Sequence, residues 1–170
     1  MKLTAKIAIL FIALCSTTLT IAQDKKPASP AATASGTING ATIKIDYSSP
    51  FVKGRTIWGD LVPYSKVWRA GANKATTFDI SKNIKVEGKE LAAGKYTFFV
   101  IPEKDGKATV IFNKEIKDLN PYNYDEAKDA LRVSVKTKKA AKLVESLVYN
   151  VNKDNVTLSW EYLEIPVSIK

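Results

Sequence analysis

The sequence predicts an all-β protein: a single-domain antiparallel β-sandwich of about eight or nine short strands, with two long loops and at most short helical turns. Three observations lead to this prediction. From Gly36 onward, apolar residues recur at every second position, turn-forming pairs separate these runs, and no segment has the apolar period of an amphipathic helix. A chain of 170 residues suits one domain with a sizeable core, so no second domain is expected.

Residues 1–22 have the pattern of a secretory signal peptide. Lys2 and Lys6 form the positive start, and Ile7–Leu14 is an apolar run too short to span a membrane. Thr20-Ile21-Ala22 offers small residues to a signal peptidase, which predicts cleavage before Gln23. The protein is therefore expected to be exported, to the periplasm or the extracellular space.

Cys15 raises the alternative of a bacterial lipoprotein. A lipoprotein signal requires a small residue before the cysteine, and Leu14 stands there, so lipidation is the less favoured reading. Cleavage leaves the mature chain without cysteine, hence without a disulfide or a thiol nucleophile. No later run is long and apolar enough to cross a bilayer, so no transmembrane segment is expected in the mature chain.

Residues 23–35, "QDKKPASPAATAS", lack large apolar side chains and are rich in Pro, Ala and Ser. Such a composition buries too little surface to order itself. We therefore expect a flexible linker over 23–35 and the β-sandwich domain over 36–170.

Alternation of apolar and polar residues marks half-buried strands at 42–47, 131–136 and 156–162, the last with Val156, Leu158, Trp160 and Tyr162 facing the core. The run Lys95–Ile101 is apolar on both faces, as in a central strand covered on both sides. Turn-forming residues predict the connections at Asn39-Gly40, Glu87-Gly88, Asp105-Gly106 and 152–155.

Two stretches, Ser48–Asn73 and Asn113–Asp129, do not follow the strand rhythm. Short helical turns are expected within them, near residues 58–61 and 120–128. Long loops in compact domains are commonly binding loops or lids, so if the protein has a site, these two loops are where it is expected.

Composition excludes many functions. The chain has no histidine, which removes the usual Ser-His-Asp and Cys-His catalysis and the imidazole-based metal sites. No glycine-rich phosphate loop follows a strand, so we expect no nucleotide and no cofactor. The net charge of +9, or +7 without Lys2 and Lys6, is spread over many lysines, which argues against a nucleic-acid partner.

Acidic residues leave two weaker possibilities. Asp125, Glu126 and Asp129 could hold a hard cation but lack the spacing of a calcium loop, so a solvated acidic turn is preferred and no metal site is predicted. Asp46, Asp60, Asp79 and Asp125 could supply a glycosidase-like carboxylate pair, yet their spacing fixes no distance and we assign no catalytic residue.

Arginine usage is more informative. Only Arg55, Arg69 and Arg132 are arginine in a chain that otherwise uses lysine for positive charge. A planar guanidinium suits carboxylates or several backbone carbonyls. Two of the three share the first long loop with tryptophans, and the candidate ligand-binding residues are Arg55, Trp58, Trp68, Arg69 and Asn73. These side chains either brace the loop, which is the favoured reading, or line a pocket for an anionic or hydroxyl-rich ligand.

The stretch "SSPFVKGRTIWGDLVPYSKVWRAGANKATTFDISKNIKVEGKELAAGKYTFFVIP" resembles the core of the bacterial family called domain of unknown function 2911, common in Bacteroidota. The segment "YNYDEAKDALRVSV" is similar to a later part of it. The most specific clusters are Lys53-Gly54-Arg55, Val67-Trp68-Arg69 and Gly71-Ala72-Asn73. The resemblance implies an exported, mostly β domain and no activity, so no functional residues are carried over.

The leading hypothesis is a non-enzymatic binding module for a small molecule, glycan or protein partner. One alternative is a carboxylate-dependent polysaccharide hydrolase or lyase, which two facing carboxylates in one groove would favour. The other is a structural or assembly module of the cell envelope, which an unpaired sheet edge or exposed apolar patch would favour.

Overall fold

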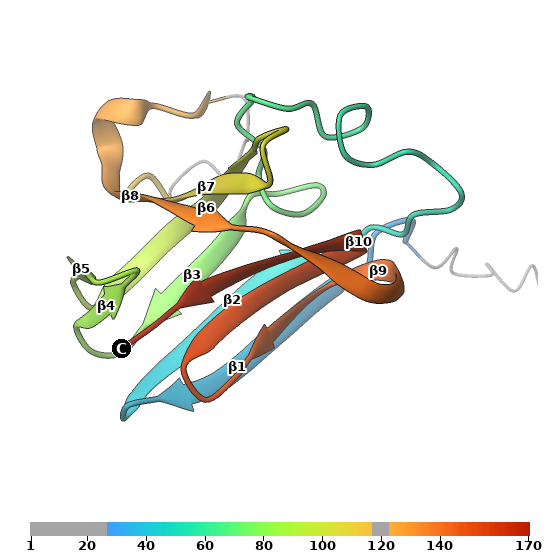
Figure 1. Cartoon of the computed structure of the whole chain (residues 1–170). Coiled ribbons are helices and arrows are strands. Elements are labelled where there is room, and N and C mark those ends of the chain that lie inside the picture. The colour runs from blue at the N-terminus through green and yellow to red at the C-terminus, as the bar shows by residue number, and fades with distance from the viewer. Residues whose placement is uncertain (1–26, 117–122) are drawn as a thin grey trace, which may run out of the picture.

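A computed structural model describes residues 27–116 and 123–170, whose arrangement is shown in Figure 1. These residues form ten antiparallel strands and one short 3-10 helix, which confirms the all-β prediction. The count exceeds the eight or nine expected, and the last two strands, of 14 residues each, are not short. The elements are β1 (Ala31–Ile38), β2 (Ala41–Ser48), β3 (Thr76–Ile80), β4 (Ile84–Val86), β5 (Lys89–Leu91), β6 (Gly94–Pro102), β7 (Lys107–Asn113), η2 (Glu126–Lys128), β8 (Asp129–Lys136), β9 (Lys138–Val151) and β10 (Asn155–Ser168).

Six strands form one sheet in the order β1-β2-β3-β6-β7-β8, and the β9–β10 hairpin covers one face of it (Figure 1). The core lies between them, where Phe78, Phe98 and Phe112 of the sheet and Leu158 and Trp160 of the hairpin are fully buried. β4 and β5 form a separate small ribbon. The hydrophobic effect of closing these two apolar faces on each other is what stabilises the arrangement.

β6 lies between β3 and β7, and its residues 96–100 are all buried. This confirms that Lys95–Ile101 belongs to a central strand covered on both faces. The second covered face is smaller: Phe99 and Ile111 are buried there, and Tyr124 from the second long loop packs against them. The predicted turns also connect strands, with Asn39-Gly40 in the left-handed region at φ 49° and 76°, as a two-residue hairpin turn requires.

The amino-terminal boundary differs from the prediction. β1 begins at Ala31, so residues 31–35, expected in the linker, belong to the folded domain. All of β1 pairs with β2, from Ala31 opposite Ser48 to Ile38 opposite Ala41. Main-chain hydrogen bonds hold these small residues in place, and composition does not reveal such bonds because it reflects only side-chain burial. The predicted signal 1–22 and Cys15 lie outside the described residues.

Tyr162 also departs from its prediction. Strict alternation along β10 would bury it beside Trp160, yet it is 49 % exposed. The register between β10 and β9 shifts on either side of Glu161, whose φ is +54°. This bulge reverses the alternation, so that Ile165 and Val167 take up the inward positions beyond it.

The first long loop connects β2 to β3. Trp68 and Val100 exchange backbone hydrogen bonds of 2.8 and 2.9 Å, and Phe51 forms a bridge with Ser146, so the loop is tied to both layers. Residues 59–61 form a turn between the bridged residues Trp58 and Val62, without a helix, while η2 lies within the helical stretch expected at 120–128. In the described part of the chain, no helix is long and apolar enough to cross a membrane.

Candidate functional site

The three tryptophans of the chain meet at one end of the core. Trp68 and Trp160 stack with ring centroids 5.8 Å apart and planes inclined by 16°. Trp58 stands edge-on to both, at 5.6 and 6.1 Å. Edge-to-face and offset-stacked rings attract each other beyond the gain from burial, by about 0.5–1.5 kcal/mol a pair. The cluster therefore gives the loop a rigid aromatic support.

A cavity of about 230 Å³, here called the Arg69 cavity, opens beside this cluster. The first long loop supplies most of its wall and β10 supplies one ring. Within the described residues, its lining contains two arginines and no acidic side chain. It is lined by Ser29, Pro50, Arg55, Leu61, Val62, Trp68, Arg69, Gly71, Ala72 and Trp160.

Among the described residues, Arg69 has no partner for its charge. Its Nε is buried, and no described residue accepts a hydrogen bond from the guanidinium or forms an ion pair with it. Trp160, also in the wall, is 1 % exposed, and its Nε1 is likewise without an acceptor in the described chain. An unsatisfied buried donor costs about 1–3 kcal/mol, and more for a charged group. Both residues line the Arg69 cavity, and an acceptor that reached either donor would remove this cost.

Arg55 lines the same cavity but has a different role. Its Nε donates to the carbonyl oxygen of Val52 at 3.0 Å, and its Nη2 donates to that of Phe51. These bonds hold the loop closed on itself, as the bracing interpretation predicts. Arg55 thus fits the bracing interpretation, whereas Arg69 fits the interpretation of a ligand-binding residue.

The backbone beside Arg69 is strained. Ala70 is fully buried at φ +52°, a conformation that costs a residue with a Cβ about 1–2 kcal/mol. Its carbonyl oxygen accepts hydrogen bonds from Tyr149 Oη at 2.7 Å and Thr76 Oγ1 at 3.0 Å. Burial raises the pKa of the Tyr149 phenol well above its usual value, so that it stays a donor. A Cβ at Gly71 would lie 2.9 Å from Thr76 Oγ1, so only glycine fits there.

The same loop concentrates unusual backbone conformations. Four of the seven described non-glycine residues with positive φ lie between β2 and β3, namely Lys53, Ser65, Ala70 and Asn73. Strained residues persist only where the surrounding structure over-determines them, and they gather at binding and catalytic sites. The distribution favours this loop as the functional region.

The remaining predicted residues lie outside the Arg69 cavity. Trp58 contacts the two tryptophans in its wall but lines a second cavity, and its Nε1 donates to the Trp160 carbonyl oxygen at 3.4 Å. Asn73 is an exposed turn residue at φ +57°; its Nδ2 donates to the carbonyl oxygen of Ser29 at 3.3 Å. Asn73 thus holds the chain that borders the cavity without lining it.

Sequence reasoning missed Trp160 as a site residue. The only signal for it was that it is the third tryptophan, at an inward strand position. The three acidic groups of the possible cation site are engaged within the protein: Asp125 caps η2, Glu126 pairs with Arg132, and Asp129 accepts from Tyr124 Oη at 2.6 Å. No group of three or more potential metal ligands occurs among the residues that the structure describes.

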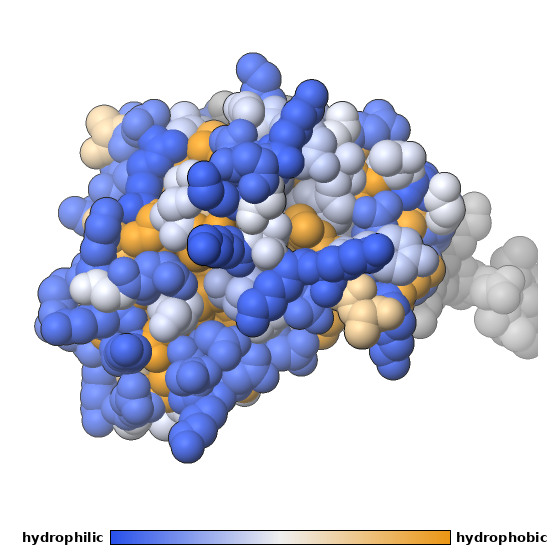
Figure 2. All heavy atoms as spheres, in the orientation of Figure 1, coloured by the Kyte–Doolittle hydropathy of each residue, from blue (hydrophilic) through white to orange (hydrophobic). Residues whose placement is uncertain are grey.

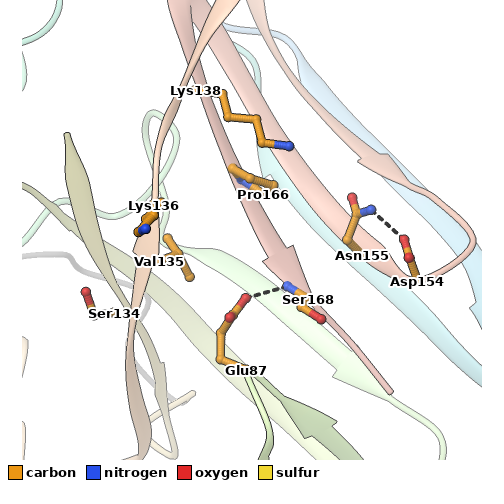
Figure 3. A pocket seen from close by; sticks show the side chains of 9 residues that line it. All are labelled: Glu87, Ser134, Val135, Lys136, Lys138, Asp154, Asn155, Pro166 and Ser168. Carbon is orange, nitrogen blue, oxygen red and sulfur yellow. Dashed lines mark hydrogen bonds between the residues drawn. The ribbon is translucent and has the colours of Figure 1, made fainter.

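A wider cavity, of about 500 Å³, lies where β8 and the end of β10 diverge (Figure 3). Its carboxylates already have donors from the protein: Glu87 accepts from the backbone N–H of Ser168 at 2.6 Å, and Asp154 accepts from Asn155 Nδ2 at 2.7 Å. No aromatic ring lines it among the described residues. It therefore lacks the anchoring groups that distinguish the Arg69 cavity.

Comparison with known proteins agrees with the resemblance seen in the sequence. Residues 29–169 match the family described as "Protein of unknown function (DUF2911)". Neither the curated proteins nor the solved structures provide a match. The matched range includes every strand and both long loops, so this chain belongs to the DUF2911 family.

Proposed function

We propose that this protein is an exported, non-enzymatic binding module, and that its ligand is a small molecule, or the end of a glycan or protein partner, that carries a carboxylate. The observation that carries the proposal is the unpaired Arg69 guanidinium in the wall of a cavity. An arginine kept for structure finds acceptors, as Arg55 does in the same loop.

The chemistry of the wall supports a carboxylate. Guanidinium binds carboxylate through two parallel N–H···O bonds, which are roughly twice as strong as neutral hydrogen bonds. The indole N–H of Trp160 is a further donor in the same wall. Leu61, Val62 and the ring of Trp68 offer an apolar surface to the rest of the ligand.

The size of the cavity limits the ligand. At about 230 Å³ it is smaller than the roughly 300–1,000 Å³ of pockets for drug-sized molecules. It accommodates a carboxylate with one small ring or a short aliphatic chain. A larger glycan or protein ligand would place only its acidic end there.

The sheet is open, with β1 and β8 as its edge strands, but the protein's exposed apolar residues give little support to an assembly role. Hydrophilic side chains surround small, separate apolar patches on the face shown in Figure 2. The large exposed apolar residues of the described chain are also scattered, over Leu61, Val67, Ile116, Leu143 and Tyr162. Single exposed apolar residues are normal and do not define an interface.

Isothermal titration calorimetry with benzoate and phenylacetate, each compared with its amide, tests the proposal. We expect the carboxylates to bind and the amides not to bind. Arg69→Met should weaken carboxylate binding by about tenfold or more, because it removes the charge-assisted bonds. Lys74→Met is the matched control, since Lys74 carries the same charge in the same loop but faces another cavity.

Equal binding of benzoate and benzamide would contradict the proposal, and so would carboxylate binding that survives in Arg69→Met. If no carboxylate binds and Arg69→Met fails to fold, Arg69 has a bracing role instead.

A further inference from the structure

A second cavity, of about 210 Å³, lies next to the tryptophan cluster on the side of Trp58. We call it the Tyr162 cavity. Its wall combines three aromatic rings with three charged side chains, which come from two separate segments of the chain. The residues that matter here are Trp58, Tyr64, Glu103, Lys104, Glu161 and Tyr162.

Tyr162 is held at this cavity by a backbone irregularity. The bulge at Glu161, with φ +54°, turns Tyr162 away from the core and leaves it 49 % exposed. The same bulge places the Glu161 side chain in the cavity wall. Strand bulges re-aim side chains, and they are over-represented next to functional sites.

Tyr64 is positioned by close packing on a glycine. A Cβ at Gly59 would lie 2.6 Å from Tyr64 Cε2, so the ring rests on the bare backbone. The next residue, Ser65, has its N–H bonded to the Pro102 carbonyl oxygen at 2.8 Å and its Oγ to Glu103 Oε2 at 2.6 Å. Tyr64 and Glu103 are therefore fixed relative to each other.

Several polar groups around these rings are free to bind a ligand. In the described chain, Glu161 and Lys104 form no side-chain hydrogen bond or ion pair, and only Oε2 of Glu103 has a partner. Two carboxylates and one ammonium make the wall net negative by one charge. It therefore disfavours anionic ligands, in contrast to the Arg69 cavity.

We propose that the Tyr162 cavity is a second binding site, which takes one ring of a neutral saccharide. A pyranose presents C–H groups on its faces and hydroxyls around its edge. Aromatic rings provide an apolar surface for the C–H groups, and free carboxylate and ammonium groups form hydrogen bonds with the hydroxyls. The cavity volume suits one ring, and its open rim leaves room for a chain to continue.

The test uses cellohexaose, xylohexaose, laminarihexaose and chitohexaose as probes. Titration is followed by calorimetry and by tryptophan fluorescence, since Trp58 lines the cavity. We expect at least one of these neutral oligosaccharides to bind. Tyr162→Ala should weaken that binding by about tenfold, because it removes an aromatic anchor. Leu143→Ala removes a similarly exposed apolar side chain elsewhere and should leave binding unchanged.

Glu161→Gln separates the carboxylate from the ring: it should weaken binding while the thermal unfolding of the variant stays close to that of the wild type. Absence of binding for all four probes would overturn the inference, and so would full binding by Tyr162→Ala. The outcome does not depend on the proposed function, because Arg69→Met should leave neutral oligosaccharide binding intact. Saccharide binding that is lost in Arg69→Met but kept in Tyr162→Ala would assign it to the Arg69 cavity instead.

Discussion

The Arg69 cavity and the Tyr162 cavity adjoin one tryptophan cluster but differ in charge and in construction. The first has two arginines and no acidic side chain in its described wall, and its key donor lacks an acceptor. The second has two glutamates and one lysine around exposed rings. The same aromatic support thus presents a cationic surface on one side and a weakly acidic one on the other. The ring cluster therefore supplies rigidity to both sides, while the charges at its margins distinguish the ligand chemistry that we propose for each.

Trp160→Ala should produce the largest effect, because it removes a ring that lines the Arg69 cavity and also supports Trp58 of the Tyr162 cavity. Trp160 is 1 % exposed, stacks on Trp68 and contacts Trp58. Truncation of a buried tryptophan costs about 3–5 kcal/mol of unfolding free energy. Urea denaturation should show this loss, with ligand binding weakened at both cavities. A loss below about 1 kcal/mol would mean that the cavities are supported independently.

Alkaline pH should lower the stability of the fold in part through Tyr149, which bonds the loop beside Arg69. The unfolded Tyr149 phenol ionises near pH 10, whereas burial raises the pKa of the folded one well above that value. The folded state then keeps a proton that the unfolded state loses. The unfolding free energy should therefore fall as the pH rises above about 10, by up to about 1.4 kcal/mol per pH unit for this group.

Urea denaturation between pH 9 and 11 measures that slope. Tyr149→Phe should reduce it but not remove it, because burial also raises the pKa values of Tyr96 and Tyr124. An unchanged slope in Tyr149→Phe would show that its hydroxyl does not contribute.

Replacement of the two loop arginines should affect stability differently. Arg55→Met removes donors to two carbonyl oxygens and should cost about 1 kcal/mol. Arg69→Met removes a buried unpaired donor and should leave stability unchanged or raise it by up to about 1 kcal/mol. Thermal unfolding of both variants gives the comparison. A clear loss of stability in Arg69→Met would contradict the distinction drawn between them.

The sequence predicted the strands and turns because alternation and turn chemistry are local properties. It also predicted a candidate binding loop, since rare arginine and tryptophan are visible in composition, and the role of that loop stays a prediction. It did not distinguish Arg55 from Arg69, because both are loop arginines and only folding decides which one meets carbonyls. Trp160 was missed as a site residue because its approach to Trp68 depends on how two distant segments pack.

The exposure of Tyr162 was missed for a related reason. Period-two alternation assumes that no residue is inserted, and a glutamate gives no hint of the left-handed conformation that a bulge requires.

The left-handed conformation of Glu161 also provides the smallest predicted effect, which is confined to the Tyr162 side. Glu161→Gly relieves the strain of a φ of +54°. The greater freedom of glycine in the unfolded chain offsets part of this gain, so the unfolding free energy should rise by about 0.5–1 kcal/mol. Saccharide binding should nevertheless weaken, because the carboxylate is lost, whereas Glu161→Gln loses the carboxylate without relieving the strain. Chemical denaturation and titration of the two variants separate these contributions. If Glu161→Gly is no more stable than Glu161→Gln, the bulge is unstrained, and the argument for the Tyr162 cavity then rests on its side chains alone.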